Sequence, residues 1–271
     1  DPSTRAMVQL DSGEIWLGSN ESGVTVLDEQ LRSIATLRPA PGQRGGLSGG
    51  RISSLVQMKD GTIWLGSDGG LHQYTRDRQL LRVIQAGTGR ARRLLAGRDG
   101  TLWIGTQDGL FRLPPGSSAH GAQAGLTTPI RLRQEGGQPL TGDVNALSET
   151  EDGGLWVGTE KGLYRIAPGG TELVVARARP GRDLSHHSIV GLLVDSKQRL
   201  WVDTAAGLHL LTRWDGRDAE FDRISEKHGV LGRAFGANLL EDGEGRIWSQ
   251  NFVYDPAKDN YYELTKADGV D

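Results

Sequence analysis

The chain contains 271 residues, carries a formal net charge of −3 and has no cysteine. Without cysteine it has no disulfide, no thiolate metal site and no cysteine nucleophile. The small net charge gives no general attraction to nucleic acid or to an anionic membrane, and no apolar run approaches the ~20 residues of a membrane helix. The 40 glycines indicate many tight turns.

From the N-terminus onward the chain repeats one short phrase: a strand with a central tryptophan, a turn and a returning strand. The clearest copy is DGTIWLGSDGGLHQY at Asp60–Tyr74, in which Asp-Gly and Ser-Asp-Gly-Gly are turn signals around the tryptophan strand. In chain order the copies are Ser12–Leu27, Asp60–Tyr74, Asp99–Leu113, Asp152–Ile166, Lys197–Leu211 and Glu244–Pro256. Their tryptophans, which we predict to be structural, are Trp16, Trp64, Trp103, Trp156, Trp201 and Trp248.

Two further predicted strands flank each phrase. The preceding, inner strands are Thr4–Leu10, Arg51–Met58, Arg92–Ala96, Val144–Ser148, Ile189–Val194 and Phe235–Leu240. The following, outer strands are Leu31–Leu37, Gln79–Ile84, Ile130–Arg133, Glu172–Ala176, Glu220–Ile224 and Asn260–Leu264.

Four short antiparallel strands that recur every ~40 to 50 residues are typical of β-propeller blades. Helical repeats would need long glycine-free segments, and coils of a β-helix are much shorter. We therefore predict an all-β fold, a single β-propeller domain over residues 1–271. Its blades would span about 1–40, 48–86, 90–134, 142–178, 186–225 and 233–266. The six visible repeats fit either a six-bladed ring or six blades of a seven-bladed one.

The repeated residues have structural explanations. Because side chains alternate along a strand, Ile63 and Leu65 should face one neighbouring blade and Trp64 the other. The Asp-Gly turns at Asp60 and its counterparts lack the alternating oxygen ligands and closing glutamate of a calcium loop. We interpret them as hairpin turns capped by aspartate, and we predict neither a metal nor a cofactor.

Three connections are long, namely Arg38–Gly50, Pro114–Gly142 and Arg177–Ser188. Loops of this length in a compact domain are usually functional or disordered, and we expect these on the same face as the turns that follow the tryptophan strands. The third holds His186 and His187, which could be ordinary loop residues, ligand contacts or a general base. Adjacent residues rarely converge on one ion, and no HExxH spacing occurs.

Repeats five and six depart from the phrase where glycine normally follows the tryptophan. Asp203 replaces that glycine in repeat five, and Ser249-Gln250-Asn251 follows Trp248 in repeat six. A side chain is tolerated there although the pattern excludes one, so these positions are candidates for function. No GxSxG, phosphate loop or dinucleotide fingerprint is present, and basic loops lack interleaved aromatics. We therefore predict neither an enzyme nor a nucleic-acid partner.

The phrases WLGSDGGLHQY, WIGTQDGLFRL and WVGTEKGLYRI closely resemble the two-component regulator propeller repeat, with its (I/L)W(I/V/L)GT-x-x-GL pattern. The resemblance covers essentially the whole chain; it is strong in repeats two to four, fair in one and five, and degraded in six. It implies the periplasmic or extracellular sensor region of a bacterial transmembrane receptor, such as a hybrid histidine kinase or a diguanylate cyclase. Some members of the family sense oligosaccharides.

The leading hypothesis is a sensor module that binds a small molecule or oligosaccharide at its loop-rich face and signals to a downstream kinase or cyclase. Self-association into a receptor dimer is a further expectation, and contact with a membrane is expected only through downstream segments that this sequence lacks. The alternatives are a protein-interaction scaffold and a propeller lyase or hydrolase. The candidate ligand-binding residues, chosen by topology, are Arg44, Asp68, Arg93, Asp108, Lys161, His186, His187, Asp203, Arg233 and Asn251.

Overall fold

The computed structural model describes residues 3–40, 46–87, 90–117, 129–230, 232, 238–249 and 252–265. In these residues, β-strands dominate and one four-residue helix, α1 (Ile224–Lys227), is present. The chain divides into two compact units, residues 1–132 with 139–143 and residues 133–138 with 144–271. The predicted all-β class is therefore confirmed.

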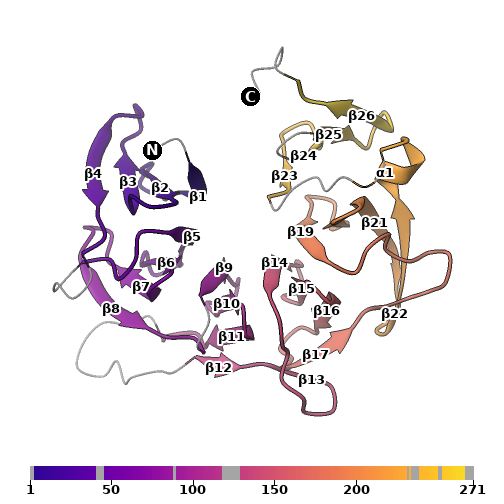
Figure 1. Cartoon of the computed structure of the whole chain (residues 1–271), viewed down its shortest axis with the longest axis horizontal. Helices are drawn as coiled ribbons and strands as arrows, with labels where there is room; N and C mark the ends of the chain where they lie inside the picture. Colours follow the sequence, from indigo (N-terminus) through magenta and orange to yellow (C-terminus); the bar gives the residue numbers. More distant parts are fainter. Residues whose placement is uncertain are drawn as a thin grey trace. The chain divides into compact units, whose positions relative to one another are not determined.

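The first unit contains three antiparallel meanders of four strands each (Figure 1). Their strands are β1 (Thr4–Gln9), β2 (Ile15–Ser19), β3 (Val24–Leu27), β4 (Ser33–Leu37), β5 (Ile52–Gln57), β6 (Ile63–Ser67), β7 (Gly70–Tyr74), β8 (Leu80–Ile84), β9 (Ala91–Ala96), β10 (Leu102–Thr106), β11 (Gly109–Leu113) and β12 (Ile130–Arg131). The tryptophan strand is the second strand of each sheet, as predicted.

The second unit repeats this arrangement in three more sheets. Their meander strands are β14 (Val144–Glu149), β15 (Leu155–Thr159), β16 (Gly162–Ile166), β17 (Glu172–Val175), β19 (Ile189–Val194), β20 (Leu200–Thr204), β21 (Gly207–Trp214), β22 (Asp218–Arg223), β23 (Leu240–Glu241), β24 (Ile247–Trp248), β25 (Phe252–Asp255) and β26 (Asn260–Glu263). Most of the predicted inner strand Phe235–Leu240 lies outside the described residues.

Two short parallel strands were not predicted. β13 (Arg133–Gln134) pairs with the outer strand β17, and β18 (Arg177–Ala178) pairs with the outer strand β22. Each belongs to the connection that leads into the sheet it joins. Each therefore satisfies backbone groups on an outer strand that would otherwise form an open sheet edge.

A five-residue turn joins the first and second strands of each described sheet, and its fourth residue has a positive φ. Glycine usually takes this place, as at Gly61 (φ 81°) and Gly100 (φ 89°), whereas Gln198 (φ 60°) takes it in the fifth sheet. In the second, third and fourth sheets an aspartate at the third place caps the turn; Asp60 Oδ1, for example, accepts the Thr62 N–H at 2.9 Å, and Asp99 and Asp152 accept the matching N–H groups. The Asp-Gly signal is thus an aspartate-capped hairpin turn, as predicted.

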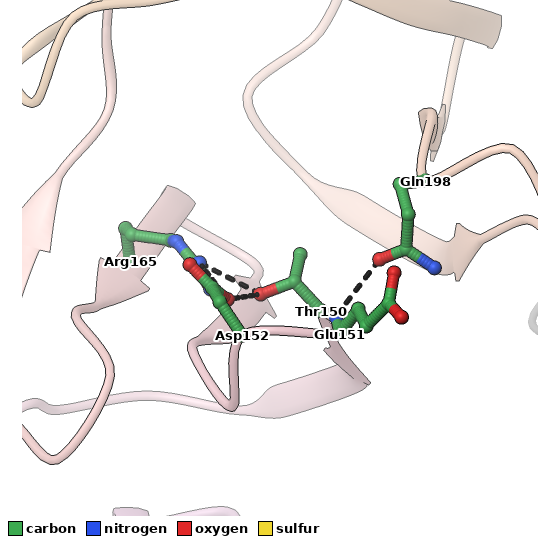
Figure 2. Close-up of a pocket in the computed structure, with 5 residues that line it drawn as sticks. All are labelled: Thr150, Glu151, Asp152, Arg165 and Gln198. Atoms are coloured by element: carbon green, nitrogen blue, oxygen red, sulfur yellow. Dashed lines mark hydrogen bonds and ion pairs between the residues drawn. The ribbon is translucent and has the colours of Figure 1, made fainter.

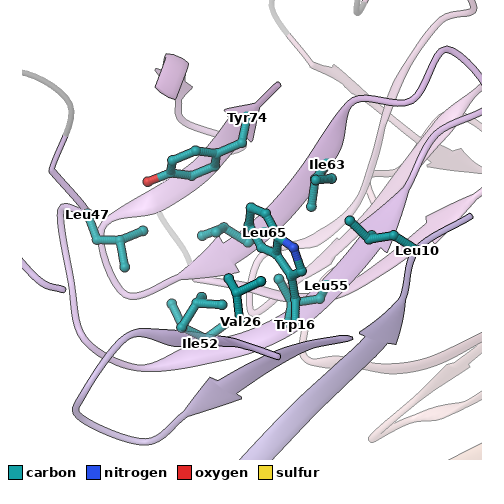
Figure 3. Close-up of a cluster of buried hydrophobic side chains, with 10 residues drawn as sticks. Leu10, Trp16, Val26, Leu47, Ile52, Leu55, Ile63, Leu65 and Tyr74 are labelled. Atoms are coloured by element: carbon teal, nitrogen blue, oxygen red, sulfur yellow. The ribbon is translucent and has the colours of Figure 1, made fainter. Parts of the chain in front are cut away.

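Within each unit the hydrophobic core lies between successive sheets. Fully buried Trp16 packs edge-on against Tyr74, with ring centroids 6.1 Å apart, and contacts the cluster that includes Ile63 and Leu65 (Figure 3). Trp64 belongs to a different cluster, shared with the third sheet. This arrangement confirms that the two sides of the β6 strand face different neighbouring sheets.

The glycine after the tryptophan is needed where successive sheets approach each other. A Cβ on Gly158 would lie 2.5 Å from the Ile189 Cγ2 of the next sheet, and a Cβ on Gly66 would lie 2.4 Å from the Ala91 carbonyl oxygen. These distances are too short for carbon contacts. In the fifth sheet Asp203 takes this position, and its cross-strand neighbour is Gly191.

Candidate functional site

The structure describes seven of the ten candidate residues; Arg44, Arg233 and Asn251 lie outside the described residues. In the first unit, Asp68 lies in the β6–β7 turn, where its Oδ1 is 3.5 Å from the Nε of Arg90. Asp108 lies at the matching turn between β10 and β11. Arg93 lies on β9. Burial is the main cause that lowers the pKa of its guanidinium, and the positive charge of Arg92 lowers this pKa further.

In the second unit, Lys161 lies in the β15–β16 turn, and its N–H donates to Thr159 Oγ1 at 3.0 Å. Asp203 lies within β20 and is fully buried. Asp203 therefore lies beneath the surface and is not exposed on the loop-rich face. The remaining two candidates, His186 and His187, lie in the connection that enters the fifth sheet.

That connection, residues 177–188, is described over its whole length. It begins as β18 on the outer edge of the fifth sheet. Further along, the Arg182 carbonyl accepts the Phe221 N–H at 2.9 Å, and the Ser188 carbonyl accepts the Ala205 N–H at 3.0 Å. Because Ala205 belongs to the β20–β21 turn, this long connection lies at the same end of the strands as the turn after the tryptophan strand, as predicted.

The two histidines at the end of this connection contact each other. The rings of His186 and His187 stack with centroids 4.4 Å apart and planes 21° apart. The Ser188 N–H donates to His186 Nδ1 at 3.0 Å. His186 is half-buried and His187 is exposed, so the stacked pair reaches the surface through His187.

A buried histidine on β21 holds the connection from below. His209 is 1% exposed, and its Nε2 accepts the Ser185 N–H at 2.9 Å while Ser185 Oγ lies 2.9 Å from the same nitrogen. Burial lowers the pKa of His209 to about 4, against the opposing effect of backbone contacts with Gly207 and Val202. The imidazole is therefore neutral at physiological pH.

The second sheet contains the same arrangement. His72 on β7 is fully buried, and its Nε2 accepts the Ser48 N–H at 3.0 Å with Ser48 Oγ at 3.2 Å. Burial lowers its pKa as well. The sequence reasoning missed both histidines. The signal that could have revealed them is the segment Leu-Ser-x-x-x-Ile at 47–52 and 184–189, which occurs in the two repeats that read Gly-Leu-His.

A shallow, open hollow of about 470 Å³ lies beside the 177–188 connection. Its lining residues are Gly181, Arg182, Phe221, Asp222, Arg223, Glu226 and Lys227. The Arg182 guanidinium is 2.7 Å from the Asp222 carboxylate, and Arg223 bonds both Glu226 at 3.1 Å and Asp183. The carboxylates of Glu226 and Asp183 raise the pKa of Arg223. The hollow thus offers paired donors and acceptors rather than a field of one sign.

A second open hollow of about 470 Å³ lies at the other end of the strands, between the turns 150–154 and 195–199 (Figure 2). Arg165 donates to Thr150 Oγ1 at 2.8 Å and lies 3.4 Å from Asp152 Oδ1, while Gln198 Oε1 accepts the Glu151 N–H at 2.8 Å. The Arg165 guanidinium also covers the Trp156 ring, 5.0 Å from its centroid. These contacts hold the fourth sheet together and join its first turn to that of the fifth sheet, so the lining side chains have a structural role. No predicted candidate residue lines this hollow.

In the described part of the chain, no group of three or more His, Asp or Glu residues is arranged to hold a metal ion. Among the helices described, none is long and apolar enough to cross a membrane.

Successive four-stranded meanders, each with a tryptophan in its second strand, place the chain in the β-propeller class. Within this class, residues 139–161 match the family model of the two component regulator propeller. The matched residues contain β14, β15 and the turn between them. The match confirms the resemblance seen in the repeated phrase. No curated protein shows significant similarity to this chain.

Solved propellers share the fold. The extracellular domain of BT3049 from B. thetaiotaomicron, named as a hybrid two component system, is 15% identical with a TM-score of 0.58, and the match covers 96% of this chain and 40% of that one. Virginiamycin B lyase from Staphylococcus aureus, in a form with quinupristin, is 12% identical with a TM-score of 0.67, and the match covers 97% of this chain and 84% of that one. PorZ of the Porphyromonas gingivalis type-IX secretion system is 14% identical with a TM-score of 0.65, and the match covers 96% of this chain and 38% of that one. This chain spans about two fifths of the B. thetaiotaomicron domains it matches.

Proposed function

We propose that this chain is a ligand-sensing β-propeller module of a bacterial transmembrane signalling receptor, on the periplasmic or extracellular side. It binds a small molecule or oligosaccharide at the end of the fifth sheet that carries the 177–188 connection. The bound state is passed to a downstream kinase or cyclase. The observation that carries this proposal is the ordered 177–188 connection, which presents His187 and Arg182 at the surface.

Long irregular connections in compact domains are usually either functional or disordered. This one is ordered, because β18, Ser185 and Ser188 each bond the fifth sheet. Binding residues are commonly placed on loops held by a rigid scaffold. The hollow beside Arg182 supplies donors and acceptors for a polar ligand, and the family match is to a propeller of two-component regulators.

The test is calorimetric titration of the chain against a panel of oligosaccharides and small polar molecules, followed by variants. His187→Ala and Arg182→Ala should each weaken binding of the ligand found by about tenfold or more, the effect of losing ~1.4 kcal/mol of contacts. Lys197→Ala is the control, because Lys197 is exposed in the turn at the opposite end of the strands. Equal affinity in both site variants would place the ligand elsewhere.

An interaction scaffold is the second candidate, and the sixth sheet favours it. Leu240, Trp248, Val253 and Tyr262 are successive cross-strand partners, so they share one face of the sheet. Leu240 is 63% exposed and Tyr262 is 44% exposed, which makes this face suited to contact with another protein surface. A lyase or hydrolase is the third candidate, since virginiamycin B lyase shows that enzymes use this fold.

A further inference from the structure

We infer that His209 is a positioning residue for the 177–188 connection: its neutral imidazole holds Ser185 in place, and protonation of the imidazole releases this part of the connection. The consequence for ligand binding rests on the proposed function, because the same connection presents the proposed site. The bond between His209 and Ser185, called the latch below, is a property of the fold and is testable without a ligand.

The geometry defines which form of the imidazole is bound. A backbone N–H can only donate, so the 2.9 Å contact from the Ser185 N–H requires His209 Nε2 to be the unprotonated nitrogen. On protonation Nε2 carries a hydrogen and faces that N–H. The Ser185 hydroxyl, 2.9 Å away, can rotate and accept, but the backbone N–H cannot. This part-buried donor then faces a second donor instead of an acceptor, which favours opening of the segment.

The same contact occurs in two sheets, which indicates that the histidine is there to bond the serine and not only to fill space in the core. His72 holds Ser48 in the second sheet with the same atoms and nearly the same distances. The equivalent cross-strand positions in the third and fourth sheets hold Phe111 and Tyr164. Histidine thus occurs in the two repeats in which a Leu-Ser-x-x-x-Ile segment precedes the inner strand.

The charged groups around His209 come from β22, from α1 and from the connection itself. Arg223 on β22 disfavours the protonated imidazole and Glu226 on α1 favours it, while Asp183 in the connection itself is paired with Arg223. His186, also in the connection, is occupied by the Ser188 N–H. Burial is the largest effect, and it holds the pKa of His209 at about 4 in the closed state, against 6.5 for an exposed imidazole.

The sign of the pH effect follows from this difference. The open segment binds the proton more tightly, so opening is favoured as the pH falls below 6.5, and the effect levels off below about pH 4. The two pKa values set an upper limit of about thirtyfold on the rise of the opening equilibrium between pH 8 and pH 5. Above pH 7 the latch should be insensitive to pH.

The test measures hydrogen exchange of the Ser185–His187 amides in the full chain at pH 8 and pH 5, corrected for intrinsic exchange. The wild type should show a clear rise in opening, of up to about thirtyfold. His209→Gln retains an acceptor that does not titrate in this range and should remove the rise. His209→Phe, which introduces the residue type of Phe111, should leave the segment open at both pH values. His187→Gln, a change of an exposed histidine in the same segment, should keep the wild-type rise.

Two results would overturn the inference: a rise of the same size in His209→Gln, or wild-type protection of Ser185 in His209→Phe. Protection of the Met58 amide, which donates to the Thr62 carbonyl at 2.8 Å in the other unit, distinguishes local release from unfolding of the variant. The measurement needs no ligand, so a failed ligand screen would count against the proposed function and leave this inference intact.

Discussion

At the scale of single residues, some turns hold a non-glycine residue in the left-handed conformation that favours glycine. Leu31, in the β3–β4 turn, has φ 61° and is 66% exposed. The left-handed conformation costs a residue with a Cβ about 1–2 kcal/mol, and glycine costs about 0.5–1 kcal/mol in chain entropy. Leu31→Gly should therefore raise the free energy of unfolding in urea by about 0.5–1 kcal/mol.

Gln198 is the matched comparison for this prediction. It also has a positive φ, but its Oε1 accepts the Glu151 N–H at 2.8 Å. Gln198→Gly should gain less than Leu31→Gly, because it relieves the same strain and loses a hydrogen bond. A loss of stability in Leu31→Gly would show that the left-handed turn is not strained there.

The residue types that build the sheets could be predicted because they are repeated, and repetition separates structural residues from the rest. Trp64 has copies at the same strand position in the other sheets, and the turn contact of Asp60 recurs at Asp99 and Asp152. His72 and His209 were missed because each histidine is the third residue of a strand, while its partner serine lies 24 residues earlier in the chain. The long connection favoured its own histidines, His186 and His187, whereas the buried His209 on β21 bonds the segment.

At the scale of elements, the contact between successive sheets depends on the glycine after the tryptophan. A Cβ on Gly158 would lie 2.5 Å from Ile189 Cγ2, so Gly158→Ala should cost about 1–3 kcal/mol of stability through overpacking. In an Ile189→Ala background the same substitution should cost at least 1 kcal/mol less, because Cγ2 is gone. Gly243→Ala is the control, since a Cβ there meets nothing within 4 Å. Additive costs in the double variant would mean that the two sheets do not meet at these atoms.

Most meander strands were predicted within two residues, because alternation and turn signals are local. The two parallel strands β13 and β18 were not, since they are two residues long and their pairing depends on where a connection passes the outer strand. The helix α1 was also missed, as its four residues continue from β22. Elements whose existence depends on distant packing leave no periodic signal in the sequence.

At the scale of the whole molecule, the second sheet packs against the first sheet on one face and against the third sheet on the other, and the first sheet differs from it on one face. Leu55 on β5 is 6% exposed and packs in the cluster around Trp16. Met7 occupies the same register position on β1, opposite Leu17 as Leu55 is opposite Leu65. Met7 is 67% exposed, so the same position in the repeat has two different environments.

This difference predicts two different costs for the same kind of truncation. Leu55→Ala should lower the free energy of unfolding by about 2–4 kcal/mol, because it opens a cavity beside Trp16. Met7→Ala should change it by less than about 0.5 kcal/mol, as expected for an exposed side chain. Urea denaturation of the two variants, followed by tryptophan fluorescence, measures both. A Met7→Ala cost as large as that of Leu55→Ala would contradict the exposure of this face and show that another surface covers Met7 in solution.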